Sequence, residues 1–75
     1  MIDSLRVSMI TLQINGVSQT FERGLNVAEL IQRLAIEGKK LAIEYNGELV
    51  PRSRYAECQV ADGDRLEIVM AVGGG

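Results

Sequence analysis

Two Asn-Gly dipeptides constrain the fold of this 75-residue chain more than any other feature. The first, at residues 15–16, separates two runs in which apolar and polar side chains alternate, within residues 9–22. Alternation with a period of two is typical of a half-buried β-strand, and Asn-Gly accepts the positive φ angles of a tight hairpin turn. The first two strands are therefore predicted to pair antiparallel. The second dipeptide, at residues 46–47, follows a similar run and predicts a turn into a short edge strand within residues 41–51.

A segment with a different period lies between these two predicted hairpins. Its apolar residues recur at the spacing of one helix face, and they are Val27, Leu30, Ile31 and Leu34. Asn26 is suited to cap the start of this helix, and Glu29, three residues later, completes a variant of the capping box. Gly38 is expected to end the helix as the residue in the left-handed conformation.

The remainder of the chain predicts one helical turn, a tight turn and a final strand. Residues 52–58 have no clean period and are interpreted as a helical turn, and residues 61–64 as a turn built on Gly63. In the final run, residues 65–72, Val69 and Ala71 make the second face apolar as well, as expected of a central strand or a partner-binding edge. The predicted order is β-β-α-β-(β)-β, an α+β architecture in which one helix covers one face of a small sheet.

Composition limits the classes of function. The length fits one domain, and the 47% hydrophobic content argues against a disordered chain. With a net charge of −2 and no long Lys/Arg cluster, a nucleic-acid partner is not expected. The chain has no apolar run of membrane-spanning length and no secretory signal, so we expect no membrane association and a cytoplasmic location.

The residues available for catalysis are few. The chain has no histidine, and its single cysteine, Cys58, excludes paired-cysteine metal sites and an internal disulfide. Cys58 is a candidate nucleophile, but it has no histidine partner to form the thiolate, and a small, partly buried hydrophobe is the alternative interpretation. Tyr45 and Tyr55 are interpreted as core or rim residues.

The chain ends on three glycines, Gly73, Gly74 and Gly75, after an apolar strand. Glycine is costly to order and adds no side chain to a core, so packing does not explain this tail. The tail either has a function or is an inert terminus. With this tail, the segments MITLQINGVSQTF, NGELVPRSRY and VADGDRLEIVMAVGGG closely resemble the ThiS-type sulfur carriers of thiamin biosynthesis, within the ubiquitin-like β-grasp family. The resemblance runs from Met9 to Gly75, which leaves residues 1–8 as an N-terminal extension, 9–72 as the domain and 73–75 as the tail.

The resemblance implies a fold and a chemistry. The fold would be a mixed sheet of four to five strands with one helix on one face, the last strand lying between the first and third and parallel to the first. The carboxylate of Gly75 would be adenylated by an ATP-dependent enzyme related to ubiquitin-activating proteins, and then converted to a thiocarboxylate with sulfur from a donor such as a cysteine desulfurase or sulfide. A thiazole synthase would receive the sulfur. The chain would be a carrier rather than an enzyme and would bind no cofactor itself, because ATP belongs to the activating partner.

Several residues are candidates for contact with these partners. Gly73 and Gly74 lack a Cβ and are suited to thread a narrow channel. The candidate docking surface consists of Val69 and Ala71 on the last strand with Leu49 and Val50 on the edge strand; ordinary packing of a second face is the alternative. Arg52 and Arg54 either pair with an acidic groove of a partner or are solvated surface.

Three other functions remain open at this point. The chain is alternatively a sulfur carrier for another pathway, such as the small subunit of molybdopterin synthase. It is alternatively a ubiquitin-like modifier whose terminal glycine becomes an isopeptide, or a plain β-grasp binding module, for RNA for example, in which the tail has no role.

Overall fold

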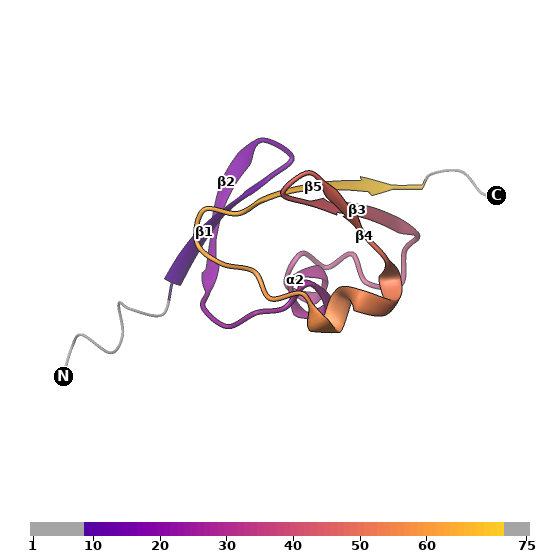
Figure 1. Ribbon diagram of the computed structural model, residues 1–75, viewed down its shortest axis with the longest axis horizontal. Coiled ribbons are helices and arrows are strands. Elements are labelled where there is room, and N and C mark those ends of the chain that lie inside the picture. Colours follow the sequence, from indigo (N-terminus) through magenta and orange to yellow (C-terminus); the bar gives the residue numbers. More distant parts are fainter. Residues whose placement is uncertain (1–8, 72–75) are drawn as a thin grey trace.

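The computed structural model describes residues 9–71, and the predicted extension (1–8) and tail (73–75) lie outside the described residues. Five strands form one mixed sheet in the order β2-β1-β5-β3-β4. The strands are β1 (Met9–Ile14), β2 (Val17–Glu22), β3 (Leu41–Tyr45), β4 (Glu48–Val50) and β5 (Arg65–Met70). The helix α2 (Val27–Arg33) and the 3₁₀ helix η1 (Arg52–Glu57) lie on one side of the sheet (Figure 1).

The two Asn-Gly hairpins form as predicted. β1 pairs antiparallel with β2, and β3 with β4; Asn15 and Asn46 have φ angles of 52° and 50°. The last strand, β5, lies between β1 and β3, parallel to β1 and antiparallel to β3. This arrangement confirms the β-grasp topology that the resemblance implied, with the final strand at the centre of the sheet.

The start of α2 matches the predicted capping box. The Glu29 N–H donates to Asn26 Oδ1 at 2.8 Å, and the Asn26 N–H donates to Glu29 Oε1 at 3.0 Å. These two bonds satisfy backbone donors that the first turn of a helix leaves unpaired. The helix start is therefore determined by two residues that lie three positions apart in the sequence.

The predicted helix end is wrong. The helix stops at Arg33, and its left-handed C′ residue is Ala35 (φ 61°). Gly38 also has a positive φ (85°), but it lies in the turn that follows and does not end the helix. The Ala35 N–H donates to the Gln32 carbonyl and the Ile36 N–H to the Ile31 carbonyl, which is the bonding pattern of a Schellman motif. Because Ile36 packs against the core, burial of its side chain favours an early end even though Ala35 carries a Cβ in that conformation.

One hydrophobic core fills the space between the sheet and the two helices. Its buried residues come from every element except β2 and β4: Ile10, Leu12, Ile14, Leu25, Val27, Leu30, Ile31, Ile43, Tyr55, Val60, Leu66 and Ile68. Three residues of the predicted helical stripe, Val27, Leu30 and Ile31, are buried in this core, whereas Leu34 follows the helix and is partly buried. Tyr55 is in the core, which is one of the two alternatives proposed. No helix within residues 9–71 is long and apolar enough to cross a membrane.

Candidate functional site: the last strand and its exposed face

Strand β5 comes immediately before the predicted reactive tail in the sequence, so we describe how this strand is held. β3 pairs with β5 along its whole length, from Tyr45 opposite Leu66 to Leu41 opposite Met70. The Ala71 N–H extends this pairing by donating to the Lys40 carbonyl at 2.9 Å. β5 is therefore held in an extended conformation up to the last described residue.

On its other edge, β5 is held first by β1 and then by a side chain. β1 pairs with β5 only up to Ile14 opposite Leu66. Beyond that point, the Asn15 side chain takes the place of a strand: its Nδ2 donates to the Ile68 carbonyl at 3.0 Å, and its Oδ1 accepts from the Ile68 N–H at 2.7 Å. The turn residue that closes the first hairpin thus also binds the central strand.

The second turn asparagine binds the start of the same strand. The Arg65 N–H donates to Asn46 Oδ1 at 2.9 Å, and the Asn46 N–H donates to the Arg65 carbonyl at 2.8 Å. Sequence reasoning treated both asparagines as turn residues only. The overlooked signal is the asparagine side chain itself. Its amide group carries both a hydrogen-bond donor and an acceptor, so it can make the pair of bonds that a neighbouring strand would make, which glycine cannot do.

A polar cluster fixes the turn that precedes β5. Asp64 accepts from the Tyr45 hydroxyl, from the Ala61 N–H at 2.7 Å and from Asn46 Nδ2 at 3.2 Å. Partial burial and the bond to Asp64 together raise the pKa of Tyr45 to about 12. Burial alone would raise the pKa of Asp64, but its hydrogen bonds outweigh burial and lower it. Tyr45 therefore lies at the rim of the core and has a structural role.

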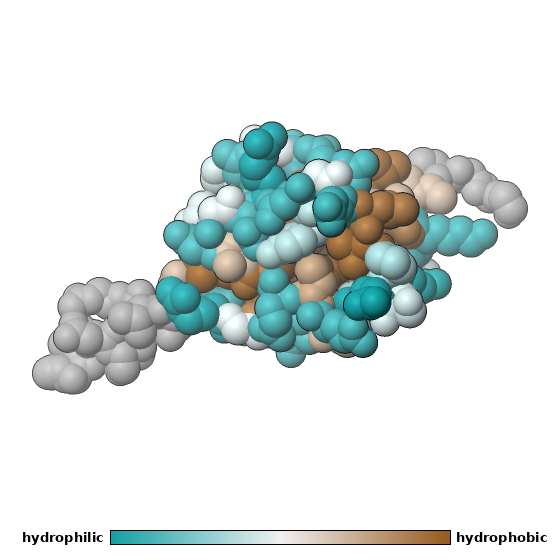
Figure 2. Space-filling model, viewed as in Figure 1, coloured by the Kyte–Doolittle hydropathy of each residue, from teal (hydrophilic) through white to brown (hydrophobic). Residues whose placement is uncertain are grey.

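The outer face of the sheet, away from the helices, carries exposed apolar side chains. Val69 is 64% exposed and Leu49 is 68% exposed. Val69 lies opposite Ala42, and Leu49 lies opposite Glu44. Ala42 and Glu44 are two residues apart on β3, so their side chains point to the same face of the sheet. Val69 and Leu49 therefore share that outer face. Hydrophobic surface gathers at the end of the molecule where β3, β4 and β5 lie (Figure 2).

The structure divides the candidate docking residues between two faces. Ala71 is exposed and follows Val69 by two positions, so it continues the outer face together with Leu49. Val50 lies opposite the buried Ile43 and packs against the core from the other face. The structure therefore brings Val69, Ala71 and Leu49 to one face and separates Val50 from them. Docking by the outer face stays a prediction.

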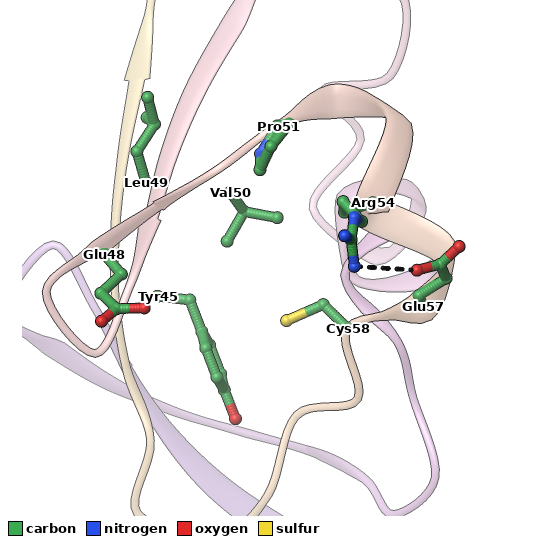
Figure 3. Close-up of a pocket in the computed structure, with 8 residues that line it drawn as sticks. All are labelled: Tyr45, Glu48, Leu49, Val50, Pro51, Arg54, Glu57 and Cys58. Atoms are coloured by element: carbon green, nitrogen blue, oxygen red, sulfur yellow. Dashed lines mark hydrogen bonds and ion pairs between the residues drawn. The ribbon is translucent and has the colours of Figure 1, made fainter.

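Cys58 lines a groove between β4 and η1 with a volume of about 390 Å³. Figure 3 shows its thiol pointing into this groove, towards Tyr45 and Val50. Burial, and to a smaller extent the charge of Asp64, raises the pKa of the Cys58 thiol. A thiol with a raised pKa is protonated at neutral pH, whereas a nucleophile needs the thiolate. The groove thus favours the interpretation of Cys58 as a packing residue.

The remaining candidates are placed as follows. Arg54 pairs with Glu57 at 3.3 Å on the exposed rim of the same groove, and Arg52 lies on the exposed surface. Gly73, Gly74 and Gly75 lie outside the described residues. Within residues 9–71, no group of three or more His, Cys, Asp or Glu side chains is arranged to hold a metal ion.

Comparison with known proteins assigns the family. The profile of the ThiS family matches residues 12–75. The chain belongs to the ThiS family. A solved structure of the thiamine biosynthesis protein ThiS from Geobacter metallireducens shares 33% sequence identity, with a TM-score of 0.76, over 88% of this chain and 100% of that one.

Two curated relatives extend this ThiS assignment. The sulfur carrier protein ThiS of Bacillus subtilis is 34% identical over 65 residues, covering 85% of this chain and 98% of that protein. A thiazole synthase of Paramagnetospirillum magneticum is 45% identical over 64 residues, which cover 85% of this chain. The match spans only 20% of that thiazole synthase, so a ThiS-like segment and the rest of that protein share one polypeptide.

Proposed function

We propose that this ThiS-family chain is a sulfur carrier for thiazole formation in thiamin biosynthesis, loaded at the α-carboxyl group of Gly75. The observation that carries the proposal is the family match over residues 12–75, which includes the three terminal glycines. The name of the Bacillus subtilis relative, a sulfur carrier protein, supports the same assignment. The anchoring of β5 agrees with it, because the strand is held in place up to Ala71, four residues before Gly75.

The proposed loading requires two steps on partner enzymes. A carboxylate oxygen of Gly75 attacks the α-phosphorus of ATP on an adenylating enzyme, and pyrophosphate leaves. A sulfur nucleophile, sulfide or the persulfide of a cysteine desulfurase, then attacks the acyl carbon and AMP leaves; with the persulfide, cleavage of the sulfur–sulfur bond by a thiol releases the thiocarboxylate. The chain binds no cofactor in this scheme. It needs no catalytic side chain, which agrees with its lack of histidine and with the protonated Cys58.

The proposed acceptor is a thiazole synthase. The thiocarboxylate sulfur attacks an electrophilic carbon of the substrate, and water then cleaves the acyl–sulfur bond, which restores the Gly75 carboxylate and leaves the sulfur on the acceptor. Support comes from the Paramagnetospirillum magneticum relative, in which a segment like this chain is part of a protein named thiazole synthase. Since ATP and free thiols are needed, we place these steps in the cytoplasm.

The test is the intact mass of the full chain after incubation with the adenylating enzyme, ATP and sulfide. We expect a mass increase that corresponds to one oxygen replaced by sulfur, localised to Gly75 by fragmentation. A matched control carries one alanine appended after Gly75 and should gain nothing. The proposal fails if the unaltered chain shows no such increase, or if the extended chain gains it equally. Ladders of larger conjugates in cells would instead indicate a protein modifier.

A further inference from the structure

Among residues 9–71, one edge of β5 has no neighbouring strand near the end of β5. In an antiparallel pair, residues alternate between positions that exchange hydrogen bonds with the partner strand and positions that face away. The bond from the Ala71 N–H to the Lys40 carbonyl fixes this alternation between β5 and β3. Met70, one residue earlier, therefore directs its N–H and its carbonyl away from β3, towards the side of the sheet where β1 lies.

On that side, β1 has already ended. Ile14 is the last residue of β1 to pair, and the Asn15 side chain satisfies Ile68, the next residue of β5 that faces this way. Met70 is the following one, and within residues 9–71 no strand or side chain pairs with it there. Figure 1 shows β5 running on beyond the tip of the β1–β2 hairpin, accompanied only by β3. We call this side of β5 at Met70 the open edge.

The open edge is flanked by apolar side chains on both faces of the sheet. Met70 is 43% exposed on the helix-covered face, and Val69 is exposed on the outer face. A strand placed along the open edge would gain backbone hydrogen bonds and would cover both side chains. This combination is the requirement for binding by strand addition, in which backbone bonds give affinity and alternate side chains give selectivity.

We propose that an extended segment of the thiazole synthase pairs with the open edge and continues the sheet in the position that β1 vacates. The proposal rests on the proposed function. Residues 72–75 separate Ala71 from the proposed thiocarboxylate, and a segment of that length spans at most about 14 Å. The enzyme that takes sulfur from Gly75 must therefore approach this end of β5. The one-polypeptide arrangement in the Paramagnetospirillum magneticum relative favours thiazole synthase as the occupant.

The first test removes the backbone donor of Met70 without removing the strand. Met70→Pro lacks the N–H, and the fold should accept it because that N–H has no partner within residues 9–71 and edge positions facing solvent tolerate proline. Met70→Ala, the matched control, shortens the side chain but keeps the N–H. We expect Met70→Pro to weaken binding to thiazole synthase about three- to tenfold relative to Met70→Ala, as the loss of one backbone bond would. Equal affinities of the two variants, both folded by circular dichroism, would overturn the proposal.

The second test needs no variant. Amide hydrogen exchange of the unaltered chain is followed alone and with thiazole synthase, without ATP or sulfide, so the result does not depend on loading of Gly75. We expect the Met70 amide to become protected in the complex. Binding without protection of Met70, protection only with the adenylating enzyme, or protection in the free chain that rises with its concentration would each overturn the inference.

These outcomes separate the inference from the proposed function. A chain that gains sulfur at Gly75 and binds thiazole synthase with an unprotected Met70 amide refutes the open-edge contact alone. A chain that never gains sulfur refutes the carrier function, whatever the exchange of Met70. Absence of any binding to thiazole synthase refutes both the contact and the proposed acceptor.

Discussion

Replacement of Asn15 by glycine tests whether this turn residue holds the central strand. Asn15→Gly keeps the turn, because glycine adopts a φ of 52° without strain, but it removes both side-chain bonds to the Ile68 backbone. An intramolecular hydrogen bond contributes about 1 kcal/mol net, so the two bonds together stabilise the fold by roughly 1–3 kcal/mol. Glycine relieves the strain of the left-handed conformation, which stabilises the variant, and it is freer in the unfolded chain, which destabilises it. Each effect is about 1 kcal/mol or less, and the two oppose one another.

The expected net loss is therefore about 2 kcal/mol in the free energy of unfolding. A domain of this size has roughly 4–11 kcal/mol in total, so the loss is a large fraction of it. At about 4–8 °C per kcal/mol, the melting temperature should fall by roughly 8–16 °C. The chain has no tryptophan, so thermal and urea unfolding are best followed by far-ultraviolet circular dichroism. The Ile68 amide should also exchange faster than in the unaltered chain.

Asn46→Gly is the matched comparison. Its side-chain bonds, to the Arg65 N–H and to Asp64, are exposed, and the backbone bond from the Asn46 N–H to the Arg65 carbonyl survives the change. We expect this variant to lose about 1 kcal/mol or less, because water replaces exposed hydrogen bonds readily. An Asn15→Gly variant as stable as the unaltered chain, or no less stable than Asn46→Gly, would refute the assignment of a strand-like role to the Asn15 side chain.

Four further predictions address the docking face, the alkaline and acid pH dependence, and the core. Val69→Asp should raise the KM of the adenylating enzyme for this chain at least about tenfold without lowering the melting temperature. The control, Met9→Asp, lies on the same face at the far end of β1 and should leave the KM unchanged. Equal KM values for the two variants would count against docking by Val69. The pKa of Tyr45 is raised from 10.0 to about 12 in the folded state. The stability that Tyr45 contributes is therefore present below pH 10 and is lost between pH 10 and 12. In urea titrations, Tyr45→Phe should lack this alkaline loss of stability. The pKa of Asp64 is lowered, so its contribution is lost as the pH falls below about 4, and an acid titration of Asp64→Asn that matches the parent would contradict this. Leu30→Ala removes a fully buried side chain and should lower the free energy of unfolding by about 2–5 kcal/mol in urea titrations, and a loss below about 1 kcal/mol would mean that the helix is not central to the core.

Local chemistry explains why much of the fold was predictable. The two hairpins depend on Asn-Gly turns between alternating runs, and the helix start depends on Asn26 and Glu29, which lie three residues apart. Each of these features is determined by neighbours in sequence, so no knowledge of the tertiary structure is needed. The position of β5 between β1 and β3 was different: the residue pattern left it open, and only the family resemblance supplied it.

The features that the residue pattern did not predict depend on contacts between distant parts of the chain. The helix ends at Arg33, with Ala35 rather than Gly38 as its left-handed C′ residue, because Ile36 packs against a core assembled from other elements. Val50 faces the core rather than the docking face because the register of β4 places it opposite Ile43.

The sequence by itself determined where strands, turns and the helix start lie, which residues form the core stripe, and that three glycines follow the last strand. Only the tertiary structure decided that Asn15 replaces a strand beside Ile68 and that Met70 is left with an open edge. The physical reason is that a backbone group is paired or free according to which strand lies beside it. In the centre of this sheet, that strand comes from the opposite end of the chain.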